Sequence, residues 1–173
     1  TTVADPSTSA ATEVTTEVAT EVATEVATEE TGAAATEANS SAVLPADATI
    51  ITLGEAIGIT GGGAEASSNG VRITQAGSYV LQGTLADGIV EVDAAGVEVH
   101  LYLNGVSITN SNGPAIVFYA SSASNVTLVE GTTNTLVDGG EHDDYDATLW
   151  SSATLTIDGA GDLIVTGNYQ EGI

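Results

Sequence analysis

Val97-Glu-Val-His-Leu-Tyr-Leu103 is the longest run of the chain in which apolar and polar residues alternate strictly. A period of two predicts a β-strand with valine and leucine on the buried face and Glu98, His100 and Tyr102 on the outer face. Asn104-Gly105 follows at once, and a polar residue before glycine is typical of a turn. The run therefore predicts a strand that ends at a sharp change of direction.

The turn after this strand recurs along the chain at intervals of about 20 to 30 residues. It appears as Gln82-Gly83, Asn104-Gly105, Glu130-Gly131 and Asp158-Gly159. A second element recurs between the turns, as Asp87-Gly-Ile-Val-Glu-Val92, Pro114-Ala-Ile-Val-Phe-Tyr119, Asp146-Ala-Thr-Leu-Trp-Ser151 and a shorter Glu171-Gly-Ile173.

Several short strands per repeat at this period are typical of a solenoid, in which equivalent residues of successive coils stack about 4.8 Å apart. No segment has the pattern of a long amphipathic helix. We therefore predict an all-β fold, a right-handed parallel β-helix of about four coils after an extended low-complexity tail. A β-sandwich is the alternative.

Residues 1–47 differ in composition from residues 48–173, so we expect an acidic tail, acting as a stalk or donor strand, and a β-helix domain that ends mid-coil. The tail repeats Thr-Glu-Val-Ala, which is compatible with extended chain. A lone strand and an incomplete coil both leave backbone groups that need a partner edge. We therefore predict contacts between subunits at Val14, Val18, Val22, Val26 and Ile173.

The charge balance excludes several classes of partner. The chain has 24 acidic residues and one basic residue, Arg72, and its formal net charge is −23. Nucleic acids and anionic membrane surfaces both attract basic side chains, so neither is expected as a partner. No apolar run approaches the roughly 20 residues that span a membrane. The composition, rich in threonine, serine and glycine and without cysteine, is typical of a secreted or cell-surface protein.

Stacking the second recurring element places Asp146 and Glu171 one coil apart. Two carboxylates at that distance repel each other unless a cation bridges them. Further oxygen ligands lie nearby in the sequence, at Asp138, Asp143, Asp144 and Asn168. Calcium takes six to eight oxygen ligands, so we predict a calcium site here, with a solvated acidic loop as the alternative.

The same stacking predicts a column of Glu91, Phe118 and Trp150 on the outer face, with Val90 and Val117 in the core. Flat aromatic rings pack against the faces of sugar rings, and exposed apolar side chains mark interaction sites. The column therefore predicts carbohydrate binding, a contact between proteins, or burial under the N-terminal segment.

Catalysis is not expected. Lyase chemistry on uronates usually takes an arginine or a lysine as base, but lysine is absent and Arg72 lies in an early strand. The polar residues at the glycine turns, Asn104, Glu130 and Asp158, are expected to be structural. We therefore predict that the protein is not an enzyme.

Several stretches together resemble a known family. They are Gly77-Ser-Tyr-Val-Leu-Gln-Gly-Thr-Leu85, Leu103-Asn-Gly-Val-Ser-Ile-Thr109, Glu130-Gly-Thr-Thr-Asn-Thr-Leu-Val-Asp138, Leu155-Thr-Ile-Asp-Gly-Ala-Gly-Asp-Leu163 and Gly167-Asn-Tyr-Gln-Glu-Gly-Ile173. Residues 48–173 resemble the bacterial secreted carbohydrate-binding domains with a polysaccharide-lyase-like right-handed β-helix, first noted in cellulose-degrading clostridia. The resemblance implies a calcium-binding β-helix that binds plant-type polysaccharides without cleaving them.

Two functions are consistent with the sequence. The first is a non-catalytic, extracellular, calcium-associated module that binds polysaccharide. The second is a structural subunit of an extracellular filament, assembled by donation of the N-terminal strand or by end-to-end stacking of β-helix edges.

Overall fold

The computed structural model of the protein describes residues 44–140 and 145–173, and the structural statements below concern these two ranges. They hold strands and no helix, so no helix of the described chain is long and apolar enough to cross a membrane. The strands are β1 (Thr49–Leu53), β2 (Gly58–Thr60), β3 (Ala64–Ser67), β4 (Gly70–Ile73), β5 (Gly77–Leu85), β6 (Ile89–Asp93), β7 (Glu98–Thr109), β8 (Ile116–Ala120), β9 (Ala123–Leu128), β10 (Thr133–Val137), β11 (Leu149–Ser151), β12 (Leu155–Gly159) and β13 (Asp162–Thr166).

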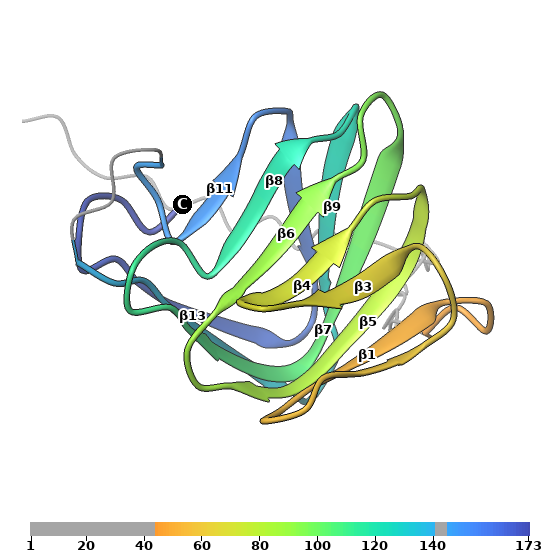
Figure 1. Ribbon diagram of the computed structural model, residues 1–173, viewed down its shortest axis with the longest axis horizontal. Coiled ribbons are helices and arrows are strands. Elements are labelled where there is room, and N and C mark those ends of the chain that lie inside the picture. Colours follow the sequence, from red (N-terminus) through yellow and green to blue (C-terminus); the bar gives the residue numbers. More distant parts are fainter. Residues whose placement is uncertain (1–43, 141–144) are drawn as a thin grey trace, which may run out of the picture. The chain divides into compact units, whose positions relative to one another are not determined.

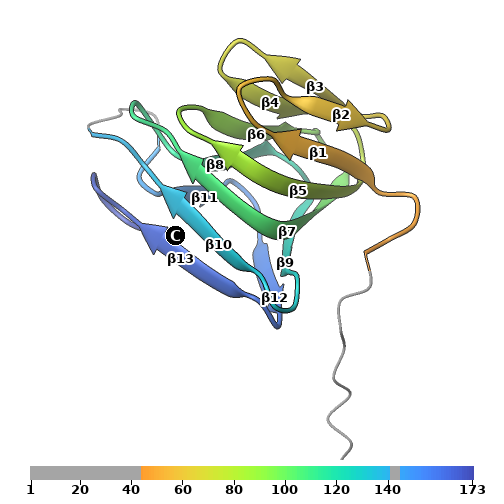
Figure 2. The ribbon, with the colours of Figure 1, turned by 90° about the horizontal axis from the view of Figure 1, so that it is seen from below.

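The strands form a parallel β-helix with three faces (Figures 1 and 2). The first face holds β1, β5, the first half of β7, β9 and β12. The second face holds the ends of β5 and β7 with β10 and β13. The third face holds β4, β6, β8 and β11, which lie side by side in Figure 1. The predicted all-β solenoid of about four coils is therefore confirmed.

The first coil is covered by two short strands that run in the opposite direction. β2 pairs antiparallel with β1, and β3 pairs antiparallel with β4. Both edges of the first coil thus have their backbone groups engaged, which is how sheet proteins protect an edge from pairing with other chains.

Apolar side chains of successive coils stack inside the helix. One column runs through Ile51, Leu81, Leu103 and Leu128, which pair in register and are buried. Each fully buried side chain of this size stabilises the folded state by about 1.5 to 3 kcal/mol relative to the same side chain left exposed. The alternating run at Val97–Leu103 therefore forms the predicted strand with its predicted buried face.

Asn134 is a buried polar residue that fixes the bend in β7. Its Oδ1 accepts hydrogen bonds from the backbone N–H groups of Gly105 (3.0 Å) and Val106 (3.1 Å). Its Nδ2 donates to Thr132 Oγ1 (3.2 Å) and to the carbonyl of Asp162 (3.1 Å). One side chain thus joins three successive coils, and Gly105 supplies the left-handed conformation of the bend with a φ of 72°.

The predicted exposure of Phe118 is wrong. Glu91 and Trp150 both pair with Val117, whereas Phe118 pairs with Val92 and has 0% exposure. A register error of one residue moves a side chain to the opposite face of a sheet. Val117 and Phe118 are both apolar, so the alternation in the sequence does not identify which of them faces inward.

We predict that Phe118→Ala lowers the free energy of unfolding by about 3 to 5 kcal/mol, because it leaves a cavity in the core. The matched control is the adjacent Tyr119→Ala. That side chain is 60% exposed, so the change is expected to stay within about 0.5 kcal/mol. Denaturation in urea measures both values, and equal effects of the two substitutions would contradict the observed register.

His100 lies in a chain of hydrogen bonds on the outer side of the first face. Its Nε2 lies 2.7 Å from Thr127 Oγ1, its Nδ1 lies 3.3 Å from Tyr102 Oη, and Thr127 donates to Asp158 Oδ1 at 2.5 Å. Because Thr127 gives its one proton to Asp158, it accepts from His100, and the neutral imidazole is then fully bonded. Burial lowers the pKa of His100 below its ordinary 6.5, although the charges of Asp158 and Glu98 act in the opposite direction.

We predict that the protein loses stability as the pH falls below about 6.5, because the unfolded chain then binds the histidine proton more readily than the folded chain. Urea denaturation between about pH 7.5 and pH 5.5, above the range in which ordinary carboxylates titrate, measures the loss. The His100→Gln variant should lack it over this window. An identical pH dependence of the variant and the wild type would exclude His100 as the cause.

Candidate functional site

The candidate site lies on the outer side of the third face. One column runs across four successive coils, because each of its residues pairs in register with the next. Its members are Arg72, Glu91, Val117 and Trp150. Their strand neighbours other than Ser151 belong to the core, so alternation directs this column outward. Val117 is nevertheless covered, with 1% exposure. The sequence analysis placed Glu91 and Trp150 in one column correctly, although the residue between them is Val117.

Aromatic side chains gather around this column. Tyr145 and Trp150 meet edge to face, with ring centroids 5.0 Å apart and an interplanar angle of 63°. Tyr119, at the end of β8, is the most exposed large hydrophobic residue of the described chain. Neither tyrosine was identified from the sequence, because β8 has no apolar–polar alternation and Tyr145 lies outside the strands.

A pocket of about 200 Å³ lies among these residues and is lined by Arg72, Glu91, Asp93, Tyr119 and Tyr145. This volume is below the roughly 300 to 1,000 Å³ of pockets that enclose a drug-sized ligand. The pocket can therefore hold part of a ligand, such as a single ring, while the rest of the ligand lies along the sheet.

The charges in this pocket are partly paired. The Arg72 guanidinium donates a hydrogen bond to Asp93 and forms an ion pair with it. This hydrogen bond and the charge of Asp93 raise the pKa of Arg72, and the charges of Glu91 and Glu65 act in the same direction. Arg72 therefore remains a cation, and Glu91 and Asp93 supply acceptor oxygens beside it.

Two of the predicted calcium ligands, Asp138 and Asn168, lie together across one coil. The backbone N–H of Asn168 donates to Asp138 Oδ1, and Asn168 Nδ2 donates to the carbonyl of Asp138 at 2.8 Å. Asp138 is buried, whereas Asn168 is exposed. Because its amide nitrogen faces Asp138, Asn168 retains its side-chain oxygen for another partner.

The predicted pairing of Asp146 with Glu171 is offset by one residue. Glu171 forms a bridge with Ala147, and its backbone N–H donates to the carbonyl of Asp146 at 2.8 Å. The two residues are thus neighbours in space, but not in one column. Asp143 and Asp144 lie outside the described residues. Within residues 44–140 and 145–173, no three acidic or histidine side chains form a group that could hold a metal ion.

Most of the predicted assembly residues are not described by the structure. The described ranges do not include Val14, Val18, Val22 and Val26. Ile173 is described and is exposed. Assembly between subunits remains a prediction from the sequence.

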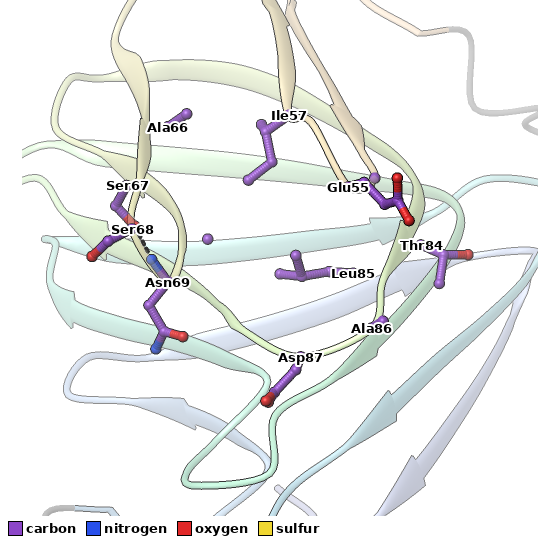
Figure 3. A pocket seen from close by; sticks show the side chains of 12 residues that line it. Glu55, Ile57, Ala66, Ser67, Ser68, Asn69, Thr84, Leu85, Ala86 and Asp87 are labelled. Carbon is purple, nitrogen blue, oxygen red and sulfur yellow. Dashed lines mark hydrogen bonds between the residues drawn. The ribbon is translucent and has the colours of Figure 1, made fainter.

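A larger pocket of about 520 Å³ lies where the first coil meets the second (Figure 3). Ile57 and Leu85 point toward its middle, and Glu55, Asn69 and Asp87 lie around it. Asp87 is already engaged, because the backbone N–H and the hydroxyl of Ser111 donate to its carboxylate and lower its pKa. Its lining contains no aromatic ring, so the third face is the better candidate for a ligand that stacks.

Three comparisons relate the chain to known proteins. The family model described as "Carbohydrate-binding domain-containing protein" matches residues 67–173. A curated protein of that description from Acetivibrio thermocellus is 33% identical over 119 residues, which are 64% of this chain and 42% of the relative. A solved structure, the polysaccharide lyase-like protein from C. thermocellum as a gadolinium derivative, matches with a TM-score of 0.69 and 30% identity.

The solved structure is matched over 73% of this chain and 55% of its own, so the chain spans about half the length of its relatives. The match of the family model extends over most of the described β-helix and includes all four strands of its third face, but not β1, β2 and most of β3. The parallel β-helix, its aromatic outer face and these matches lead to one conclusion: the chain belongs to the family of carbohydrate-binding domain-containing proteins.

Proposed function

We propose that the outer side of the third face binds a neutral polysaccharide, and that the protein is an extracellular module that binds without cleaving. The observation that carries the proposal is the grouping of Tyr119, Tyr145 and Trp150 beside Arg72 and Glu91. Membership of a carbohydrate-binding family and the composition rich in threonine, serine and glycine support it.

The site combines the two kinds of contact that a sugar needs. The faces of a pyranose ring carry C–H groups and pack against aromatic rings, such as those of Tyr119 and Trp150. The hydroxyl groups at the ring edge need hydrogen-bond partners, which Arg72 provides as a donor and Glu91 as an acceptor. Arg72, Glu91 and Trp150 belong to three different coils of one column, in which Val117 is buried, so a bound glycan would contact more than one coil.

The net negative charge of the protein favours neutral over acidic polysaccharides as ligands. With a net charge of −23, the chain repels polymers of uronic acids unless cations lie between the two surfaces. A neutral glycan meets no such repulsion. We therefore assign a neutral polysaccharide as the ligand class.

The charges of the site support binding rather than cleavage. A general base works best when its pKa lies near the operating pH. The pKa of Arg72 is instead raised by its hydrogen bond to Asp93, so Arg72 is a poor base. It is better suited to hold a sugar hydroxyl than to abstract a proton.

Calcium is part of the proposal because the residues present suit it. Asp138 and Asn168 contact each other between successive coils, and Asn168 keeps its amide oxygen for another partner. Asp146, eight residues after Asp138, is exposed. Oxygen ligands of this kind are those that calcium prefers. Bound there, the ion would neutralise acidic groups and join the two coils.

We predict that Trp150→Ala lowers the affinity for a soluble neutral hexasaccharide about tenfold, because one stacking contact is lost. Trp150→Phe keeps an aromatic ring and is the matched control, with most of the affinity retained. Isothermal titration calorimetry measures both, after thermal melting has shown that both variants are folded. Unchanged affinity in Trp150→Ala would remove the third face as the binding site.

We predict that calcium raises the melting temperature of the protein and that a chelator reverses the rise, because a ligand of the folded state stabilises it by mass action. Asp146→Asn should reduce the rise, whereas Asp162→Asn, which alters an exposed carboxylate on β13, should leave it intact. Coincident melting curves of the wild type with and without chelator would refute a calcium site.

A further inference from the structure

The outer side of the second face is covered with hydroxyl groups. Strand alternation directs every second residue of β7, β10 and β13 outward on this face. The outward hydroxyl residues are Ser107, Thr109, Thr133, Thr135 and Thr166, and we name this surface the threonine face.

The threonine face is regular. Thr135 pairs with Ser107 on one side and with Ile164 on the other, and no residue is skipped between these strands. Residues in one column are therefore about 4.8 Å apart, and outward residues of one strand about 6.8 Å apart. Neither of the two pockets described above lies among β7, β10 and β13, although Thr84, which pairs with Ser107, lines the larger one.

The hydroxyl groups of the threonine face have no hydrogen-bond partner among the side chains and backbone groups that the structure describes. The first face differs, because its outward polar residues bond to one another. Asn104 donates to Gln82, Gln82 donates to Thr52, and His100 pairs with Thr127. The threonine face thus keeps both its donors and its acceptors for an outside partner.

The threonine face is also nearly free of charge. Its other outward residues are Val137, Ile164 and Asp162, of which Ile164 is 51% exposed and only Asp162 carries a charge. The whole chain has 24 acidic residues, whereas Asp162 is the one carboxylate among the outward residues of β10, β13 and the end of β7. A partner that fits here is uncharged, flat and rich in hydroxyl groups.

We infer that the threonine face is a second glycan-binding surface, which lies against the ordered chains at the surface of an insoluble neutral polysaccharide. The inference rests on the proposed function and adds a second site to it. The third face stacks on a single chain by its aromatic rings, whereas the threonine face contacts several parallel chains through repeated hydroxyl pairs. One molecule then adheres to an insoluble glycan through a surface that a short soluble oligosaccharide does not use.

The test compares two ligands with the full chain. The double variant Thr109→Val and Thr135→Val removes two hydroxyl groups and preserves both the shape and the strand preference of the residues. Its partition onto insoluble β-1,4-glucan particles is expected to fall about tenfold or more, while its affinity for the soluble hexasaccharide stays at the wild-type value. Thr156→Val, an exposed threonine on the first face, is the matched control and should bind both ligands normally.

Three results would overturn the inference. If the double variant binds the particles as the wild type does, the threonine face is not a glycan surface, while the proposed third-face site stands as long as hexasaccharide binding persists. If the wild type binds neither ligand, the proposed function and the inference fail together. If the wild type sediments as an oligomer that Thr135→Arg converts to a monomer, the threonine face is a contact between copies of the chain.

Discussion

The parallel backbone register between coils is the constraint on which this structure depends. Once β5 pairs with β7 and β7 with β9, every side chain has a fixed neighbour above and below, and a slip of one residue would exchange core and surface. Asn134 holds that register at the bend, because it binds backbone groups of the coil before and the coil after its own. A single buried amide thus keeps two faces aligned.

Much of the fold could be predicted from the sequence, because the alternation at Val97–Leu103 and the recurring glycine turns both report on backbone geometry. The inward direction of Phe118 could not, since Val117 and Phe118 are both apolar and the turn before β8 alters the spacing. The antiparallel direction of β2 and β3 was also missed, because alternation reveals a strand but not its direction.

The candidate site was predicted in part. Trp150 and Glu91 were found because they share a repeat, while Tyr145 lies outside any repeated strand and its contact with Trp150 depends on the folded chain. Arg72 was noticed as the one basic residue, but its pairing with Asp93 joins two neighbouring coils and has no local signal. The residues predicted for calcium lie in loops, where spacing in the sequence does not determine distance in space.

The three faces give one scaffold three different surfaces. Outward polar groups bond to one another on the first face, remain available on the second and surround aromatic rings on the third. The outward residues of the three faces come from different strand segments around one shared core. This separation allows the faces to be tested one at a time.

The reversed strands at the first coil give the solenoid a direction of growth. A parallel coil can serve as a template for the next coil, but β2 and β3 occupy the edges of β1 and β4 and run the opposite way. New coils can therefore be templated only on the side of β12 and β13. A designer who lengthens this scaffold therefore has to add repeats on that side.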